Sequence, residues 1–401
     1  MPECEAPIKH AAEIAHFRQL CCLGIDAHTA MPSLLKGLHG LIGSNSNAFY
    51  WTSHNGDVTN AYMEQLLPKD LLAAFFKDFL NNRNCALSAH GLRNCLKSDQ
   101  VVGNSAKIFP KSFHQSDVYN LFWRPESRKQ MLWARVRDAQ GRENGVTMCR
   151  VVGDAEFTDR DERLLAQLVP YFAHALNAPS ESPAQFVDAG ESAVVVVNRR
   201  GDVEHESVEG RRLMLLAAHP RVAPGAADWR SDQVIPSALR SLLDRVEAIA
   251  AGRPTSPPVM ELQNCWGKFM FRAYPLNSGG GIVDGAIVIL IERQVPLKLK
   301  LLDSMQFLPL SAKQKEVCLL LTNGCSYHDL AQRLGVGRTT IIDHVRKIYD
   351  KLDVHNHHEL LSTLVQGNHA RAGNGVTGRS VKQVSAITRA DGQLLGSTTR
   401  H

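Results

Sequence analysis

Apolar side chains recur at helical spacing near the carboxyl end of the chain, where four short helices are predicted between residues 310 and 366. The second helix begins at Ser326, with Asp329 three residues on as a capping partner, and ends at Gly335, a residue type suited to the left-handed backbone of a helix end. Similar pairs start the first and fourth helices: Ser311 with Gln314, and Asn356 with Glu359. The third helix runs from about residue 338 to 352. A helix, a glycine turn and a second helix at this spacing indicate a helix-turn-helix, whose second helix fits the DNA major groove.

The phase of the 338–352 helix decides which of its side chains can reach DNA. Four aliphatic residues share one side and are predicted to face a small core: Ile341, Val345, Ile348 and Leu352. The candidate DNA contacts lie elsewhere: Ser326, Arg338, Thr339, Thr340, Ile342, Asp343, Arg346 and Lys347. Arg346 suits a guanine edge, Asp343 a cytosine amino group and Ile342 a thymine methyl group. The other five are expected to meet phosphates and to set the register on the duplex.

At these positions the chain resembles the LuxR-type (GerE-like) DNA-binding domain of bacterial transcription regulators. The matching residues are Leu310-Ser311, Glu316-Val317, Gly324, Leu330-Ala331, Leu334-Gly335, Thr340-Ile341, His344, Ile348 and Lys351-Leu352. The resemblance implies a four-helix domain that binds DNA as a dimer, often through its fourth helix. The sequence departs from the usual pattern at four positions: Gly337, Cys318, Ile342 and Asp343. The last two stand where lysine and an apolar residue are frequent, which leaves the target sequence open.

The predicted head carries no broad basic field, because its cations and anions balance over residues 303–366. The cations are Lys313, Lys315, Arg333, Arg338, Arg346, Lys347 and Lys351, and the anions are Asp303, Glu316, Asp329, Asp343, Asp350, Asp353 and Glu359. A non-specific binder relies on excess positive charge. We therefore expect locally placed contacts and two copies acting together.

Residues 8–178 mix helical and β-type patterns and predict an α+β domain with an antiparallel sheet. Helices are predicted over 14–22, 31–42 and 70–80, a short strand over 48–51, and a hairpin from 131–138 and 145–152. The domain closes with a helix that Thr158 caps, and Pro170 inside it predicts a kink. The phrase FTDRDERLLAQLVPYFAHAL resembles the ending of GAF-like sensor domains.

Residues 184–295 follow a Pro/Ser linker, and their pattern of apolar and polar positions predicts a second α+β domain. The order is two strands (193–197 and 203–207), two helices (209–218 and 236–251) and three strands (259–264, 268–274 and 286–291). This order resembles a PAS-like domain, which implies a five-stranded antiparallel sheet with helices on one face. Residues 296–309 are predicted to form a connecting helix. Residues 367–401, rich in Gly, Ser and Thr, are predicted to be a disordered tail.

The amino terminus, MPECEAPIKH, lacks the order of a signal peptide, and no apolar run approaches a membrane span, so a cytoplasmic protein without membrane contact is expected. The nine Cys contain no CxxC pair and are interpreted as reduced thiols. The scattered His residues show no metal-ligand spacing, and no glycine-rich nucleotide motif occurs, so no metal and no catalytic residue is predicted. The cofactor is unknown. Six aromatic residues are candidates to line a ligand cavity or to form plain core: Phe49, Tyr50, Trp51, Tyr119, Phe122 and Trp123.

The leading hypothesis is a cytoplasmic, homodimeric transcription regulator that binds a double-stranded operator, with two sensory or dimerisation domains controlling its head. A small-molecule ligand in an N-terminal domain and RNA polymerase are further candidate partners. Two alternatives stay open: a signalling adaptor with a degenerate head, and an enzyme with an accessory DNA-binding domain. A receiver-type regulator is disfavoured by the missing acidic pair, and a quorum-signal receptor by the roughly 300 residues ahead of the head.

Overall fold

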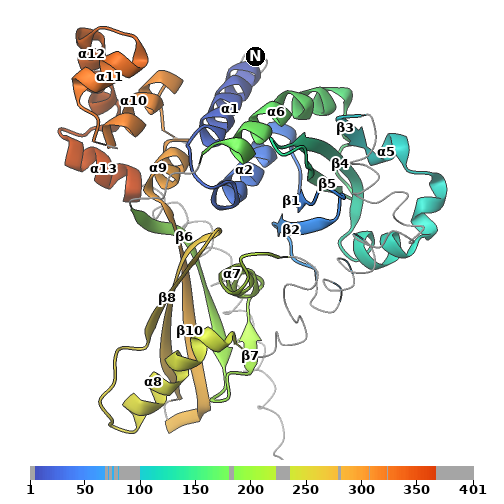
Figure 1. The fold of residues 1–401 in the computed structure, drawn as a ribbon, viewed down its shortest axis with the longest axis vertical. Coiled ribbons are helices and arrows are strands. Elements are labelled where there is room, and N and C mark those ends of the chain that lie inside the picture. The colour runs from blue at the N-terminus through green and yellow to red at the C-terminus, as the bar shows by residue number, and fades with distance from the viewer. Residues whose placement is uncertain are drawn as a thin grey trace, which may run out of the picture. The chain divides into compact units, whose positions relative to one another are not determined.

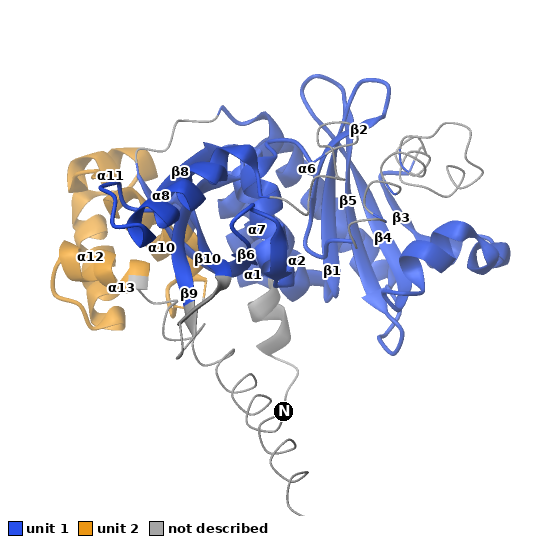
Figure 2. Ribbon diagram, turned by 90° about the horizontal axis from the view of Figure 1, so that it is seen from below, with its two compact units in different colours: residues 1–299 blue, residues 300–401 orange. Residues whose placement is uncertain are grey.

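The computed structural model describes residues 5–67, 71, 75, 80, 100–179, 185–222, 235–278, 281–306, 308–322 and 324–366 of the 401-residue chain. These residues fall into two compact units, 1–299 and 300–401 (Figures 1 and 2). Unit 1 holds two antiparallel sheets with helices, and unit 2 is helical. This is the predicted fold class. The finer domain boundaries stay predictions.

The first sheet has five strands among the described residues, in the order β2-β1-β5-β4-β3. Its strands are β1 (Ser46–Thr52), β2 (Val58–Met63), β3 (Val102–Asn104), β4 (Arg128–Arg137) and β5 (Glu143–Val151). The predicted hairpin is confirmed as β4 and β5, which pair from Arg128↔Val151 to Arg137↔Glu143. The sequence prediction missed β2 and β3, which are short and lack a clean alternation of apolar and polar residues.

Three helices lie on one side of the first sheet (Figure 1): α2 (Ala27–Ile42) and α6 (Asp159–Asn177) pack on its strands, and α1 (Glu5–Cys21) packs on these two helices. Apolar residues of all three meet there, as Phe17 of α1 lies 5.1 Å from Phe172 of α6 between ring centroids. The predicted capping box at Thr158 is present, and α6 continues through Pro170 to Asn177. Three shorter elements link β3 to β4: α5 (Ser105–Ile108), η3 (Lys111–Gln115) and η4 (Tyr119–Trp123). Most of the predicted 70–80 helix lies outside the described residues.

The second sheet also has five strands in the described part of unit 1, in the order β7-β6-β10-β9-β8. The strands are β6 (Phe186–Val197), β7 (Val203–Glu206), β8 (Val259–Asn264), β9 (Gly267–Ser278) and β10 (Gly281–Pro296). Helices α7 (Val208–Ala218) and α8 (Arg240–Ala250), with the short η6 (Ser237–Leu239), accompany it. Inward-facing side chains such as Phe271 and Ile289 are fully buried, whereas Val194 and Tyr274 face outward. The predicted order of elements is confirmed.

Side-chain contacts join the two sheets within unit 1. The buried guanidinium of Arg293, on β10, donates to the carbonyl oxygen of Thr29 on α2 at 3.4 Å. Within the second sheet it also donates to the carbonyl oxygen of Trp266 at 2.7 Å and pairs with Glu191 at 3.2 Å. Arg212 of α7 also pairs with Glu191 and donates to the hydroxyl of Tyr62 on β2. Such contacts satisfy charges that burial would otherwise penalise.

Unit 2 contains the four helices that the sequence predicts for the head, after α9 (Leu297–Met305), which begins at the end of unit 1. They are α10 (Ala312–Thr322), α11 (Tyr327–Leu334), α12 (Arg338–Leu352) and α13 (His357–Gln366). None of the helices in the described part of the chain is long and apolar enough to cross a membrane.

Candidate nucleic-acid interface

Local hydrogen bonds begin α11, and a glycine ends it before the turn to α12. The Ser326 hydroxyl accepts from the amide of Asp329 at 3.2 Å, and the Asp329 carboxylate accepts from the amide of Ser326 at 3.0 Å. These bonds satisfy amides that a helix start leaves unpaired. At the other end, Gly335 takes a left-handed backbone with φ of 63°, which glycine adopts at low cost. The predicted capping box and helix stop are both confirmed.

The buried side of α12 forms the core of the head. Ile341 and Ile348 have no exposed surface, and Val345 is 4% exposed. They share this core with fully buried residues of the other three helices: Val317, Cys318, Leu330, Leu360 and Leu364. The predicted phase of α12 is therefore confirmed, and the remaining predicted core residue, Leu352, is half-buried.

All eight candidate DNA contacts are exposed. Ile342 is the clearest case, because an isoleucine with 46% of its surface exposed stands beside the fully buried Ile341. Exposing a large aliphatic side chain gains nothing in folding, so a surface position of this kind suits a partner. The roles of the eight residues at bases and phosphates stay predictions.

The first turn of α12 leaves its backbone amides open. Gly337 is the N-cap residue and has no side chain to accept from them. Arg338, Thr339 and Thr340 follow, all exposed. Free amides and the positive end of the helix dipole together favour an anion such as a phosphate.

Two of the candidate contacts bind each other. The Lys347 ammonium lies 2.7 Å from the Asp343 carboxylate, and this hydrogen bond lowers the pKa of Asp343 below its ordinary value. The sequence analysis assigned Asp343 to a base and Lys347 to a phosphate without joining them. Their spacing of four residues, with the acid first, is the signal that would have predicted the pair.

Lys351 has a structural role instead. Its ammonium donates to the carbonyl oxygen of Pro309 at 2.8 Å and to the amide oxygen of Gln314 at 2.9 Å. These bonds hold the end of α12 against the start of α10. Gln314 also accepts from the amide of Ser311, which completes the first predicted capping pair.

The family described as bacterial regulatory proteins of the luxR family matches residues 308–364. The head is a LuxR-type DNA-binding domain. The match covers α10, α11, α12 and α13 as far as residue 364, and it begins two residues before the predicted boundary. The chain is therefore a DNA-binding regulator in which a LuxR-type head follows an α+β region. No curated protein matches the chain.

Solved structures give weaker likenesses. The VqsR LBD domain from Pseudomonas aeruginosa is 14% identical, with a TM-score of 0.26, and the match covers 36% of this chain and 85% of that chain. The phage VqmA-DPO complex is 16% identical over 52% of this chain and 88% of that chain, with a TM-score of 0.19. The Vibrio cholera VqmA-Ligand-DNA complex is 14% identical over 44% and 83%, with a TM-score of 0.20. At these scores the likenesses carry no argument about this chain.

The six aromatic residues proposed for a ligand cavity do not all lie in one place. Phe49 and Trp51 point to the helical side of the first sheet, where Phe49 packs on Phe172 with ring centroids 5.9 Å apart and Trp51 stacks on His28 at 4.3 Å. Three more pack among their own neighbours: Tyr119 on His114, Phe122 on Phe75, and Trp123 on Phe113. Tyr50 lines a pocket on the opposite face of the first sheet. Alternate residues of a strand point to opposite faces, so Phe49 and Trp51 lie on the face of β1 opposite to Tyr50. A ligand cavity lined by these aromatic residues stays a prediction.

No group of three or more His, Cys, Asp or Glu side chains in the described part of the chain is placed to hold a metal ion.

Proposed function

We propose that the chain acts as a homodimer at a double-stranded operator, with α12 in the major groove and the α+β region of unit 1 controlling the head. Control requires no covalent chemistry. It requires only that a signal stabilises one arrangement of the dimer over another.

The observation that carries this proposal is the division of α12 into two sides. One side is buried as the core of the head, and the opposite side presents Ile342, Asp343 and Arg346 to solvent. On DNA, Arg346 would contact a guanine edge, and the open amides of the first turn would contact a phosphate. The Asp343–Lys347 pair would separate, so that the carboxylate meets a cytosine amino group and the ammonium a phosphate.

Dimerisation is supported by α13. Leu360 and Leu364 are fully buried in the head, whereas Leu361 and Val365 on the same helix are only partly covered. A second copy of α13 would cover them. Two heads would also provide the affinity that one electrically neutral head lacks.

The test is an electrophoretic shift with fragments selected from genomic DNA at low salt, followed by titration of the best fragment. Arg346→Ala is expected to weaken specific binding by about 1–3 kcal/mol and to relax preference at one base pair. Lys313→Ala is the matched control, because Lys313 is an exposed cation on α10 that pairs with Glu316 at 3.1 Å. Equal binding by wild type and Arg346→Ala would show that this side of α12 does not meet the bases.

If the chain shifts no DNA fragment at low salt, the result would support the adaptor hypothesis. The observations that suggest that hypothesis are Ile342, Asp343 and the zero net charge of the head.

A further inference from the structure

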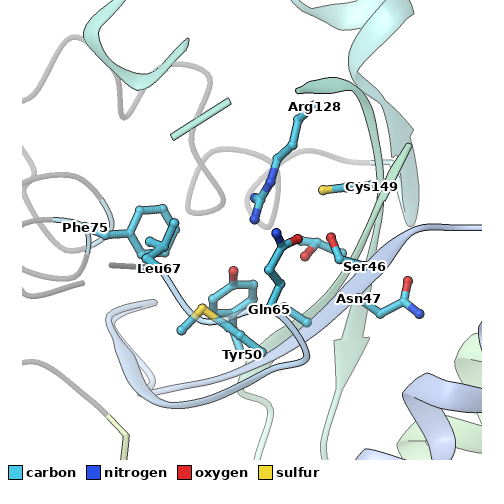
Figure 3. A pocket seen from close by; sticks show the side chains of 11 residues that line it. Ser46, Asn47, Tyr50, Gln65, Leu67, Phe75, Arg128 and Cys149 are labelled. Atoms are coloured by element: carbon cyan, nitrogen blue, oxygen red, sulfur yellow. The ribbon is translucent and has the colours of Figure 1, made fainter. Parts of the chain in front are cut away.

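The first sheet carries a pocket on the face turned away from α1, α2 and α6. Because Phe49 packs on Phe172 of α6, its neighbours on β1 must point to the opposite side of the sheet. Residues Ser46, Ala48 and Tyr50 share that side, and cross-strand pairing places Cys149 beside Ser46 and Thr147 beside Ala48. The enclosed part of the pocket is small, with a cavity volume of about 20 Å³, and it opens to solvent, so that the empty space amounts to about 330 Å³ only when the open mouth is counted. Figure 3 shows its lining, which comprises Ser46, Asn47, Ala48, Tyr50, Met63, Gln65, Leu67, Phe75, Arg128, Thr147 and Cys149.

The space exists because Ala48 occupies the middle of this face. Its partners are Thr147 on β5 and Met63 on β2, so a larger side chain at position 48 would fill the region between three strands. The alanine side chain is small and fills little space on the face of a sheet, where β-branched residues are more usual.

A charged group is directed into this space. The register of β4 against β5 shifts between Arg128 and Gln130, and such an irregularity re-aims the side chain beside it. Figure 3 shows the Arg128 guanidinium pointing into the pocket, towards Gln65 and the hydroxyl of Tyr50. The Nε–H of Arg128 is buried and has no hydrogen-bond partner in the described structure. A buried guanidinium donor without an acceptor is costly, so this group is suited to receive one.

The rest of the lining is polar but uncharged on one side and apolar on the other. Burial raises the pKa of Tyr50 to about 12, so its phenol stays neutral. No carboxylate lines the pocket in the described residues, and the nearby Glu126 accepts from Gln65 instead. Leu67 and Phe75 form the apolar wall (Figure 3).

We propose that this pocket binds a small organic acid, whose carboxylate pairs with the Arg128 guanidinium and whose short apolar or aromatic body lies against Leu67 and Phe75. The guanidinium fork matches a carboxylate in geometry as well as charge. The Tyr50 hydroxyl and the Gln65 amide complete the polar end. This inference rests on the proposed function in one respect, that such an acid would be the signal controlling the head.

The experiment measures binding to the full-length chain by isothermal titration, with a thermal-shift assay in parallel. The probes are benzoate and hexanoate, and the neutral benzamide and hexanamide serve as isosteric controls. We expect at least one acid to bind saturably and more tightly than its amide. In Arg128→Met, which keeps the length of the side chain and removes its charge, the affinity for that acid should fall on the order of tenfold to a hundredfold.

Lys129→Met is the matched control, because it removes a cation at the next position, where the side chain lies near Glu156 at the surface. It should bind the acid as the wild type does. Ala48→Val tests the space separately from the charge, and it should lower the affinity at least tenfold while the chain stays folded, because it fills an existing void. Saturable binding by neither acid, or equal binding of acid and amide by wild type and Arg128→Met, would overturn the proposal.

The DNA shift without any acid separates the two hypotheses. If the chain binds an acid through Arg128 but shifts no DNA, the result supports the proposed acid site and contradicts the proposed function. If the chain binds DNA but neither acid, the result is consistent with the proposed function and contradicts the proposed acid site.

Discussion

The hydroxyl of Thr29 donates a 2.6 Å hydrogen bond to the carbonyl oxygen of Cys265, which stands 236 residues further along the chain. The bond joins α2, which packs on the first sheet, to the turn between β8 and β9 of the second sheet. Trp51 and Trp266 meet beside it, with ring centroids 5.7 Å apart. The two α+β parts of unit 1 therefore contact each other through specific polar and aromatic groups.

Arg293 is expected to be the most sensitive residue of this contact. It is 1% exposed, and its guanidinium donates across the contact to the carbonyl oxygen of Thr29 at 3.4 Å. It also bonds to Trp266 and Glu191 of its own sheet. Arg293→Ala would leave Glu191 and a buried carbonyl oxygen without this partner, so the free energy of unfolding should fall by about 3–5 kcal/mol in urea denaturation followed by circular dichroism. Arg272→Ala is the control, because Arg272 pairs with Glu292 at a more exposed position and should cost less than about 1 kcal/mol. Equal losses in the two variants would contradict the role of Arg293.

Ile341 and Ile342 provide a second test, because adjacent and chemically identical side chains have opposite environments. Ile341→Ala should destabilise the head by about 2–5 kcal/mol through the cavity that it leaves. Ile342→Ala should change stability by less than about 0.5 kcal/mol and should weaken specific DNA binding. Thermal unfolding and the DNA shift, measured on both variants, distinguish the two effects. A destabilised Ile342→Ala would place that side chain in the core and would refute the proposed face of α12.

His39 predicts how the stability of the first sheet depends on pH. Its two ring nitrogens lie 2.9 Å from the Glu64 carboxylate and 2.6 Å from the carbonyl oxygen of Ser44, so both are placed to donate, as they do in the charged imidazolium. The hydrogen bond to Glu64 outweighs burial and raises the pKa of His39 above its ordinary value.

A raised pKa in the folded state stabilises the protein fully below the unfolded value, near pH 6.5, and the contribution is lost as pH rises through the folded value. We expect the free energy of unfolding to decline from about pH 6.5 upwards in the wild type. In His39→Gln this part of the decline should be absent. Urea denaturation between pH 6 and 9 provides the measurement, and identical pH profiles for the two proteins would contradict the prediction.

Leu361 tests the proposed dimer. It lies on α13 beside the fully buried Leu360 and is only partly covered. Leu361→Glu should leave the head folded, because the new carboxylate can reach solvent. It should shift the chain towards monomer in sedimentation velocity and weaken operator binding by tenfold or more, on the order of 1.4 kcal/mol. Glu359→Gln on the same helix is the control for changed charge. A dimer that persists in Leu361→Glu would place the dimer interface away from α13.

The sequence by itself determined the elements whose signals are local. The capping pair of Ser326 and Asp329, the glycine at position 335 and the spacing of Ile341, Val345 and Ile348 predicted α11, the turn and α12, because each depends on residues within one or two helical turns. The same holds for the β4–β5 hairpin and for the order of strands and helices in the second sheet.

The tertiary structure decided what depends on residues far apart in the sequence. Alternation along β1 separates Tyr50 from Phe49 and Trp51, but which of the two faces is covered by α6 depended on the tertiary structure. Two further features depend on strands and helices that folding brings together. They are the direction of the Arg128 side chain into the pocket and the bonds of Arg293 to Trp266 and Glu191. The pattern of residues along the chain shows which side of a helix or strand is apolar, but it does not show which other element packs on that side. For this reason the head could be predicted from the sequence and the pocket could not.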